Sequence, residues 1–341
     1  MKKIGIIGAG GIGSWHAQRW RQLEDRQPGR ITLAGYYDLS TTAAATAAAK
    51  NGGRVFRSLD ELLSAVDFVD VCTSTPQHKA PVLAAAAAGK DIVCEKPLAR
   101  NLGDAREMVQ TCKDAGVQLF VAHVVRFFNQ FALARTCLQN GDIGRPAVIR
   151  TVRGGAPPGP GGRPWFTDFE QSGGVVMDVS IHDLDFVRWC FGDVERVFAR
   201  GLTFAGVEPY DHALITLRFR NGAIGHIEGS WAYPPGPFRT GFEIAGDQGL
   251  VEWDSNDPAP LTLTLKSSES PAAPAAPQSQ SPLMPHGDPY YLELEHFLDC
   301  LENGVPPIIS AKDGLEAVRL SLATIQSIQT GRPVQLDDLA V

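Results

Sequence analysis

Short apolar runs alternate with helical patterns over the first third of the chain. The predicted strands are Lys3 to Ile7, Ile31 to Tyr37, Val55 to Phe56, Phe68 to Thr73, Asp91 to Cys94 and Val117 to Ala122. The first predicted helix follows the glycines and runs through Trp20. The other predicted helices cover Thr41 to Lys50, Ser58 to Ala65, Pro81 to Ala88 and Asn101 to Ala115. This alternation predicts an α/β domain with a doubly wound parallel sheet, in which ligands bind beyond the carboxyl ends of the strands.

The pattern changes after about residue 122, where strand-like runs follow one another with turn signals between them. The predicted strands are Ala147 to Val152, Val197 to Phe204, Ala213 to Phe219, Ala223 to Trp231, Thr240 to Ala245, Leu250 to Trp253 and Leu261 to Leu265. The predicted helices are Phe127 to Gln139, Val175 to Phe191 and two closing helices at 290–303 and 312–329. Because Asn221-Gly222 is a strong hairpin signal, we expect an α+β domain with a large, mainly antiparallel sheet. The expected domains are residues 1–122 and 123–341.

Two stretches of the second part have no periodicity. Gly154 to Pro164 is made almost entirely of glycine and proline and is expected to be irregular, as a possible lid. Ser267 to Pro285 is rich in Pro, Ala, Ser and Gln and is expected to form a mobile loop, since structured sequence resumes after it.

Composition adds limits to this picture. The 341 residues suffice for two domains, and 44% hydrophobic with 20% charged residues is typical of a globular protein. The formal charge of -7 argues against a nucleic-acid or anionic-membrane surface. The six cysteines form no C-x-x-C pair, so we expect buried thiols in a reducing compartment and no metal site. Since neither a signal peptide nor a membrane span is recognised, a cytoplasmic location is expected.

A glycine-rich turn follows the first strand and opens the first helix. Gly8, Gly10 and Gly13 match G-x-G-x-x-G, whose backbone N–H groups approach a dinucleotide pyrophosphate. Asp38 ends the next strand, somewhat later than the roughly 20 residues usual for the ribose-binding carboxylate. Such a carboxylate repels a 2′-phosphate, and residues 39–42 include no Lys or Arg, which favours NAD over NADP. The alternative is that Asp38 is only a helix N-cap.

Two further positions carry candidate chemistry. Lys96 ends a predicted strand and precedes Pro97, so an extended, partly desolvated lysine there can stabilise a developing alkoxide. Asp178, His182 and Asp185 stand at i, i+4 and i+7 of a predicted helix, and therefore on one face. A histidine between carboxylates suits a general base. The alternatives are a surface lysine at a turn and a solvated acidic face with an incidental histidine.

Four motifs occur in one order along the whole chain: Gly8-x-Gly10-x-x-Gly13, Thr75-Pro76-x-His78, Glu95-Lys96-Pro97 and Gly173-Gly174-x-x-x-Asp178-x-x-x-His182-x-x-Asp185. With them the chain resembles the Gfo/Idh/MocA family, the group of glucose–fructose oxidoreductase and inositol dehydrogenase. The resemblance implies a Rossmann domain followed by a domain built on an open sheet. In relatives one face of that sheet commonly forms an oligomer interface, so a homodimer or homotetramer is expected. The Lys96–Pro97 bond is often cis in relatives.

The resemblance also implies a reaction, in which a secondary hydroxyl of a sugar, sugar derivative or cyclitol loses a hydride to nicotinamide C4. It makes His182 the general base, Asp178 its orienting partner and Lys96 the hydroxyl and alkoxide anchor. Two alternatives stay open, a non-catalytic dinucleotide-sensing regulator and an enzyme that retains and recycles NAD(P) while acting on glycosides. The residues expected to bind the cofactor are Gly8, Gly10, Gly11, Ile12, Gly13, Asp38, Thr73, Ser74, Thr75, Pro76, His78, Glu95 and Lys96. The residues expected to contact the substrate are His123, Arg126, Arg153, Trp165 and Asp185.

Overall fold

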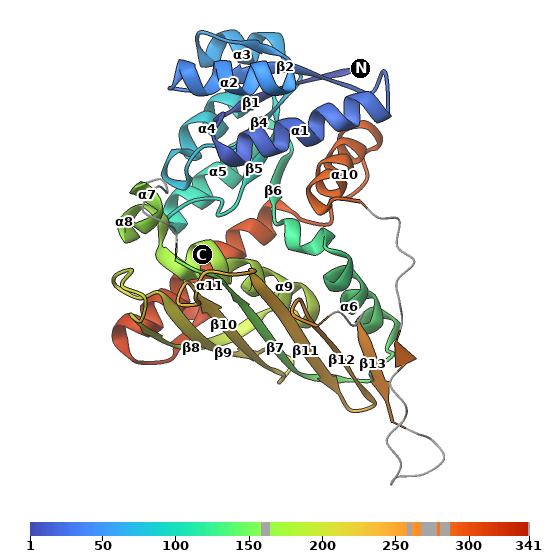
Figure 1. The fold of residues 1–341 in the computed structure, drawn as a ribbon, viewed down its shortest axis with the longest axis vertical. Coiled ribbons are helices and arrows are strands. Elements are labelled where there is room, and N and C mark those ends of the chain that lie inside the picture. Colours follow the sequence, from blue (N-terminus) through green and yellow to red (C-terminus); the bar gives the residue numbers. More distant parts are fainter. Residues whose placement is uncertain (158–163, 258–260, 267–277, 280–286, 340–341) are drawn as a thin grey trace. The chain divides into compact units, whose positions relative to one another are not determined.

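The computed structural model describes residues 1–157, 164–257, 261–266, 278–279 and 287–339 (Figure 1). The chain divides into two compact units, Met1–Phe127 with His286–Val318, and Phe128–Pro285 with Arg319–Val341. The expected division into residues 1–122 and 123–341 differs from this grouping, because the boundary falls after Phe127 and a later segment that ends at Val318 also belongs to the first unit. Helix α10 (Pro289–Asn303) belongs to the first unit, because Phe297 on α10 stacks against Phe120 with ring centroids 5.0 Å apart.

The first unit is built on a parallel sheet. Within its described residues the sheet has six strands in the order β3-β2-β1-β4-β5-β6. The strands are β1 (Lys2–Ile7), β2 (Ile31–Tyr37), β3 (Arg54–Val55), β4 (Phe68–Val71), β5 (Asp91–Glu95) and β6 (Leu119–Ala122). Each strand predicted over the first third is present, with small differences at its ends. The prediction of a doubly wound parallel sheet is confirmed.

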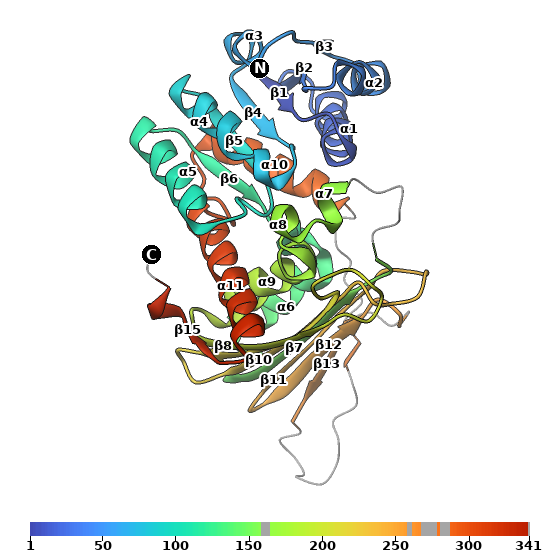
Figure 2. The ribbon, with the colours of Figure 1, turned by 90° about the vertical axis from the view of Figure 1, so that its left-hand side faces the viewer.

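Helices cover both faces of this sheet (Figure 2). They are α1 (Gly11–Arg26), α2 (Thr41–Asn51), α3 (Leu59–Ala65), α4 (Lys79–Ala87), α5 (Leu102–Ala115) and α10, with short 3-10 turns η1 (Thr75–Gln77) and η2 (Val124–Phe127). The strand order reverses between β1 and β4. Right-handed crossovers therefore put α1 and α2 on one face and α3, α4 and α5 on the other. The carboxyl ends of β1 and β4 meet at this reversal, which is where open sheets of this kind bind ligands.

The second unit is built on a larger mixed sheet. Its described part has nine strands in the order β14-β13-β12-β11-β7-β10-β9-β8-β15, with β7 and β10 parallel and the other pairs antiparallel. The strands are β7 (Pro146–Gly154), β8 (Val194–Leu202), β9 (His212–Phe219), β10 (Ile224–Ser230), β11 (Arg239–Gly246), β12 (Gly249–Asp254), β13 (Thr262–Leu265), β14 (Gln278–Ser279) and β15 (Val334–Gln335). The predicted hairpin joins β9 to β10, with Gly222 at φ +92.

Helices of the second unit lie on one face of this sheet (Figures 1 and 2). They are α6 (Asn129–Asn140), the short α7 (Pro164–Thr167) and α8 (Phe169–Ser172), a π-helical segment η3 (Val176–Ser180), α9 (Ile181–Phe191) and the closing turn η4 (Leu336–Asp338). Helix α11 (Ala311–Thr330) runs through both units. Phe131 on α6 packs edge-on against Phe186 on α9 and Phe242 on β11, at 4.8 and 5.1 Å between centroids. This aromatic cluster forms the core between helices and sheet.

Several sequence expectations have definite outcomes here. All six cysteines are buried free thiols, as predicted. The predicted continuous helix from Val175 is a π-helical turn followed by an α-helix. Of the two irregular stretches, residues 158–163 and most of 267–285 lie outside the described residues. Among the helices that the structure describes, none is both long and apolar enough to cross a membrane.

Candidate active site

The glycine-rich turn has the geometry that a dinucleotide needs. Gly8 has φ +94, and a Cβ on Gly13 would lie 1.9 Å from the carbonyl oxygen of Gly8. Gly10 is the N-cap of α1 in an extended conformation, without a side chain above the helix N-terminus. Side chains are therefore excluded from the turn by its own backbone, and the first N–H groups of α1 stay open to an anion. These residues fit NAD.

Asp38 follows β2 beside this turn. Its Oδ2 accepts the N–H of Ala9 at 2.7 Å and its Oδ1 accepts the N–H of Ser40 at 2.7 Å. The N-cap of α2 is Ser40, whose hydroxyl accepts the N–H of Ala43 at 3.2 Å. Asp38 is thus not the N-cap. A carboxylate has about four acceptor sites, so Asp38 keeps capacity for ribose hydroxyls.

His78 connects the loops that follow β4 and β5. Its Nδ1 lies 2.9 Å from the carbonyl oxygen of Pro97, and its Nε2 lies 3.1 Å from that of Thr73. The side chain is 1% exposed, and this burial lowers the pKa of His78 although the carbonyl groups oppose the shift. His78 therefore joins the Thr73–Pro76 segment to the Glu95–Pro97 segment, while its ring is unavailable to solvent.

Lys96 directly follows β5 and is half-buried. The Lys96–Pro97 peptide bond is cis. The main-chain N–H of Lys96 donates to Oε2 of Glu95 at 2.9 Å. The carboxylate of Glu95 is 7% exposed and also contacts His16, an interaction that the sequence did not indicate.

In the second unit, two glycines precede the candidate catalytic helix. Gly173 and Gly174 have φ of +76 and +62 and so both adopt the left-handed conformation. A Cβ on Gly173 would lie 2.5 Å from Sδ of Met177. The missing side chain of Gly173 therefore leaves room, within this unit, for Met177 at the start of the π-helical turn.

The segment from Gly173 to Val187 is buried except at Asp178 and His182, which are half-buried. Asp178 lies in η3 and His182 in the first turn of α9. A π-helical turn is common at functional sites because it redirects side chains locally. On β10, a Cβ on Gly229 would lie 2.0 Å from Oγ of Ser180, so the missing side chain lets this turn approach the sheet.

Arg153 was predicted to contact substrate, but its described contacts lie inside the second unit. Its Nε donates to Oδ2 of Asp183 at 2.6 Å, and both side chains are almost fully buried. Its guanidinium lies 5.5 Å from the ring centroid of Phe131. Asp183, which the sequence analysis did not single out, therefore attaches α9 to β7 through a buried ion pair. The sequence signal that could have identified Asp183 is a charged residue next to His182 in an otherwise apolar helix.

The other predicted substrate residues differ in exposure. Arg126 is 3% exposed and donates to the carbonyl oxygen of Ile308 at 2.7 Å, while its guanidinium lies 3.5 Å from Asp313. His123 and Asp185 are 0% and 1% exposed. Trp165 on α7 is half-buried, with its ring 4.7 Å from that of Phe166. Burial favours supporting roles for the first three, whereas Trp165 keeps an accessible surface.

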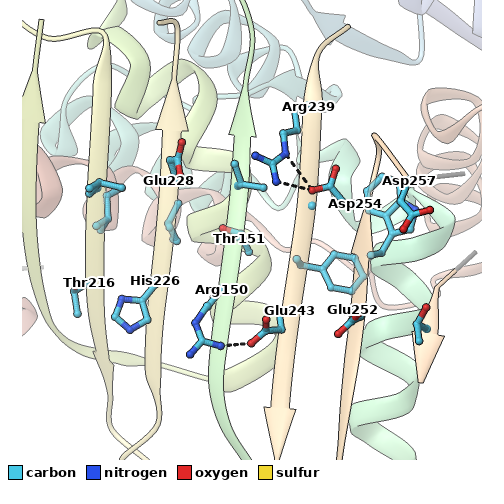
Figure 3. A pocket seen from close by; sticks show the side chains of 18 residues that line it. Arg150, Thr151, Thr216, His226, Glu228, Arg239, Glu243, Glu252, Asp254 and Asp257 are labelled. Atoms are coloured by element: carbon cyan, nitrogen blue, oxygen red, sulfur yellow. Dashed lines mark hydrogen bonds and ion pairs between the residues drawn. The ribbon is translucent and has the colours of Figure 1, made fainter. Parts of the chain in front are cut away.

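The helix-free face of the large sheet contains a hollow of about 600 Å³ (Figure 3). Charged side chains cross it in pairs: Arg150 contacts Glu243, and Nη2 of Arg239 donates to Oδ2 of Asp254 at 2.7 Å. The labelled side chains come from strands β7, β9, β10, β11 and β12, except Asp257, which follows β12. None of the predicted catalytic residues lines this hollow.

Comparisons with family models agree with the two-part organisation. A model described as the oxidoreductase family, NAD-binding Rossmann fold, matches residues 2–123. The GFO/IDH/MocA C-terminal domain matches residues 131–252. Together they cover most of the chain.

Individual relatives extend over its full length. The chain is 32% identical to the myo-inositol 2-dehydrogenase of Thermotoga maritima and 31% identical to the 1,5-anhydro-D-fructose reductase of Ensifer adhaerens, over 99% of each chain. A solved structure of a probable dehydrogenase from Thermotoga maritima has a TM-score of 0.82 at 31% identity, over 98% of this chain and 99% of that one. Levoglucosan dehydrogenase in complex with NADH and L-sorbose shares the fold, with a TM-score of 0.88 at 23% identity over 98% of both chains. A dinucleotide-fitting turn, family models for both parts and full-length relatives thus show that the chain belongs to the Gfo/Idh/MocA oxidoreductases, enzymes that act on CH–OH groups with NAD.

Proposed function

We propose that this chain oxidises a secondary hydroxyl of a sugar, a sugar derivative or a cyclitol. NAD, when bound, takes the hydride that leaves the carbinol carbon, and the hydroxyl proton passes to the protein. Relatives named for an inositol and an anhydro-sugar support this substrate class. The observation that supports the assignment most is the accessibility of Asp178 and His182 on a segment that is otherwise buried.

His182 is proposed as the general base that removes the hydroxyl proton. Imidazole suits this role near neutral pH because its ordinary pKa is close to the working pH. Asp178 precedes it by four residues across the junction of η3 and α9 and is proposed to orient the ring or to contact a neighbouring hydroxyl. The buried Arg153–Asp183 pair attaches α9, which carries His182, to β7.

Lys96 is proposed to anchor the reacting oxygen and to stabilise its negative charge as the proton leaves. Its half-buried position after β5 reduces the hydration that would compete with such a bond. Asp38 and the N-terminus of α1 are proposed to hold the adenosine ribose and the pyrophosphate of NAD.

The test is the absorbance change of the nicotinamide with a panel of inositols, aldoses, anhydro-sugars and glycosides, followed by variants on the best substrate. We expect His182→Asn to lower kcat by roughly 10²–10⁴-fold, the range of general-base catalysis, while the Kd for NAD stays nearly unchanged. Lys96→Met is expected to lower kcat at least as much.

Lys113→Met is the matched control, because Lys113 is an exposed lysine on α5 of the same unit. It should leave kcat and KM unchanged. Wild-type kcat in both active-site variants would contradict the residue roles. NAD binding without oxidation of any panel member would instead favour a dinucleotide-sensing regulator, and NAD that survives desalting would favour a recycled cofactor.

We also propose that the helix-free face of the large sheet joins copies of this chain into a dimer or tetramer. The face carries paired charges around the hollow lined by Arg150 and Glu243, and Leu214 on β9 is 53% exposed there. An exposed sheet face that combines apolar and paired charged side chains is suited to a self-complementary contact.

A further inference from the structure

We propose that His16 is a positioning residue for Lys96, which it holds through Glu95 in a buried relay of Asp70, His16 and Glu95. The inference rests on the proposed role of Lys96 and extends it to residues that contact neither substrate nor reacting atoms. All four residues belong to the first unit.

The relay crosses from α1 to the carboxyl end of the parallel sheet. His16 lies on α1, and its Nδ1 is hydrogen-bonded to Oδ2 of Asp70 on β4 at 2.9 Å. On the other side of the ring, Nε2 lies 3.1 Å from Oε1 of Glu95 at the end of β5, as an ion-pair contact. His16 and Asp70 are 0% exposed and Glu95 is 7% exposed. The imidazole thus bridges two carboxylates from adjacent strands away from solvent.

Asp70 is held by two further side chains. Its Oδ2 also accepts the indole N–H of Trp20 at 2.7 Å, and its Oδ1 accepts the thiol of Cys72 at 3.2 Å. Both carboxylate oxygens are therefore hydrogen-bonded inside the protein, which fixes the position of the carboxylate beside His16.

The surroundings of His16 favour its cationic form. Burial is the largest influence and lowers the pKa of His16, but Asp70 and then Cys72 beside the ring together raise this pKa well above its ordinary value. Cys72 follows β4, where burial raises the pKa of its own thiol, and Tyr290 on α10 also faces the ring, with ring centroids 6.0 Å apart. Neither supplies a second cation.

Glu95 transmits this arrangement to the catalytic lysine. While Oε1 faces His16, Oε2 accepts the main-chain N–H of Lys96 at 2.9 Å. Both carboxylate oxygens of Glu95 therefore contact groups of the protein. These contacts fix the backbone from which the Lys96 side chain extends. Glu95 was expected to contact the cofactor, and its inward carboxylate favours a positioning role.

A metal site is the competing interpretation of the same cluster, because ligand atoms of His16, Asp70 and Cys72 lie within 4.8 Å of one another. Metals bind the thiolate form of cysteine. Here burial raises the pKa of Cys72, and the thiol donates to Asp70. The indole N–H of Trp20 also donates to the carboxylate of Asp70. The donor set therefore matches a network of hydrogen bonds and ion-pair contacts better than a metal site.

The test compares His16→Gln and Asp70→Asn with Cys112→Ala in the full chain. Cys112→Ala is the matched control, because it truncates a buried side chain on α5 of the same unit that lies outside the relay. We expect each relay variant to lower kcat by up to roughly 10²-fold, as a misplaced catalytic group does, with the Kd for NAD changed less than about threefold. The double variant should be no worse than the more affected single variant, since both interrupt one relay.

A second readout does not depend on turnover. In histidine-labelled wild-type protein at about pH 8, above the ordinary histidine pKa of about 6.5, both ring nitrogens of His16 should carry protons by NMR. In Asp70→Asn the ring should be neutral. A neutral His16 in the wild type, or relay variants with wild-type kcat while Lys96→Met is inactive, would overturn the inference alone. A fully active Lys96→Met would instead overturn the proposed function. A kcat loss matched by an equal loss of folded protein or of NAD affinity would show a structural or cofactor-binding role.

Discussion

At the scale of single residues, exposure separates the groups proposed to react from the groups that hold them. Lys96, Asp178 and His182 are half-buried, whereas Asp70, His16 and Asp183 are fully buried and engaged with other side chains. A reacting group must be reachable by substrate, while a holding group gains strength from exclusion of water. Exposure therefore assigns roles that residue type alone does not.

Asp38 is expected to determine the preference for NAD over NADP. Asp38 is proposed to lie where NADP would carry its 2′-phosphate, and Leu39 beside it is 79% exposed. The double variant Asp38→Ala with Leu39→Arg removes the repulsion and adds a phosphate partner, so we expect kcat/KM for NADP to exceed that for NAD. Leu39→Arg alone is the control, and it should still prefer NAD because the carboxylate remains. The measurement is kcat/KM with each dinucleotide. An unchanged preference in the double variant would show that other residues determine cofactor choice.

At the scale of elements, local patterns predicted most strands and helices but not the contacts between distant segments. Alternation and glycine motifs identified the strands of the first sheet, the glycine-rich turn and β7 to β13 of the second sheet, but not the two-residue strands β14 and β15. The His16–Asp70 pair joins residues 54 positions apart, and no periodicity reports such a pairing. The π-helical turn was missed because the spacing of Asp178 and His182 also fits an α-helix. Helix α10 was grouped by its place in the sequence, whereas Phe297 packs on Phe120.

Gly173 is expected to be needed both for stability and for the position of η3. Gly173→Ala forces an alanine to φ +76 and puts its Cβ against Met177, so both stability and the position of η3 should suffer. Gly141→Ala is a matched control with the same φ of +76 and open space around the added Cβ. We expect Gly141→Ala to cost about 1 kcal/mol in unfolding free energy with kcat unchanged. Gly173→Ala should cost more and lower kcat, as measured by denaturant titration and steady-state rates. Equal effects of the two variants would mean that backbone strain, and not the contact with Met177, is what matters.

For the whole molecule, the proposed roles divide between the two units. The first has the dinucleotide turn and the relay behind Lys96, and the second has the Asp178–His182 helix and a sheet with one helix-free face. This face combines the exposed Leu214 with the Arg150–Glu243 and Arg239–Asp254 charge pairs, and it is proposed to join copies of the chain. The NAD fold and the second domain's sheet were predictable from sequence patterns, but the charge pairing across strands was not, because it depends on register.

If the helix-free face of the large sheet joins copies of the chain, a charge reversal on this face should separate them. Arg150 on β7 lies opposite Glu243 on β11 in the sheet register and contacts it (Figure 3). Arg150→Glu puts two carboxylates side by side on this face, so copies joined through it should repel each other. We expect sedimentation velocity to show a smaller species than the wild type, with unchanged circular dichroism. Lys113→Glu makes the same charge change on α5 of the other unit and should leave the wild-type species intact. A wild-type species that is already monomeric, or an Arg150→Glu variant that sediments like it, would remove this face as the interface.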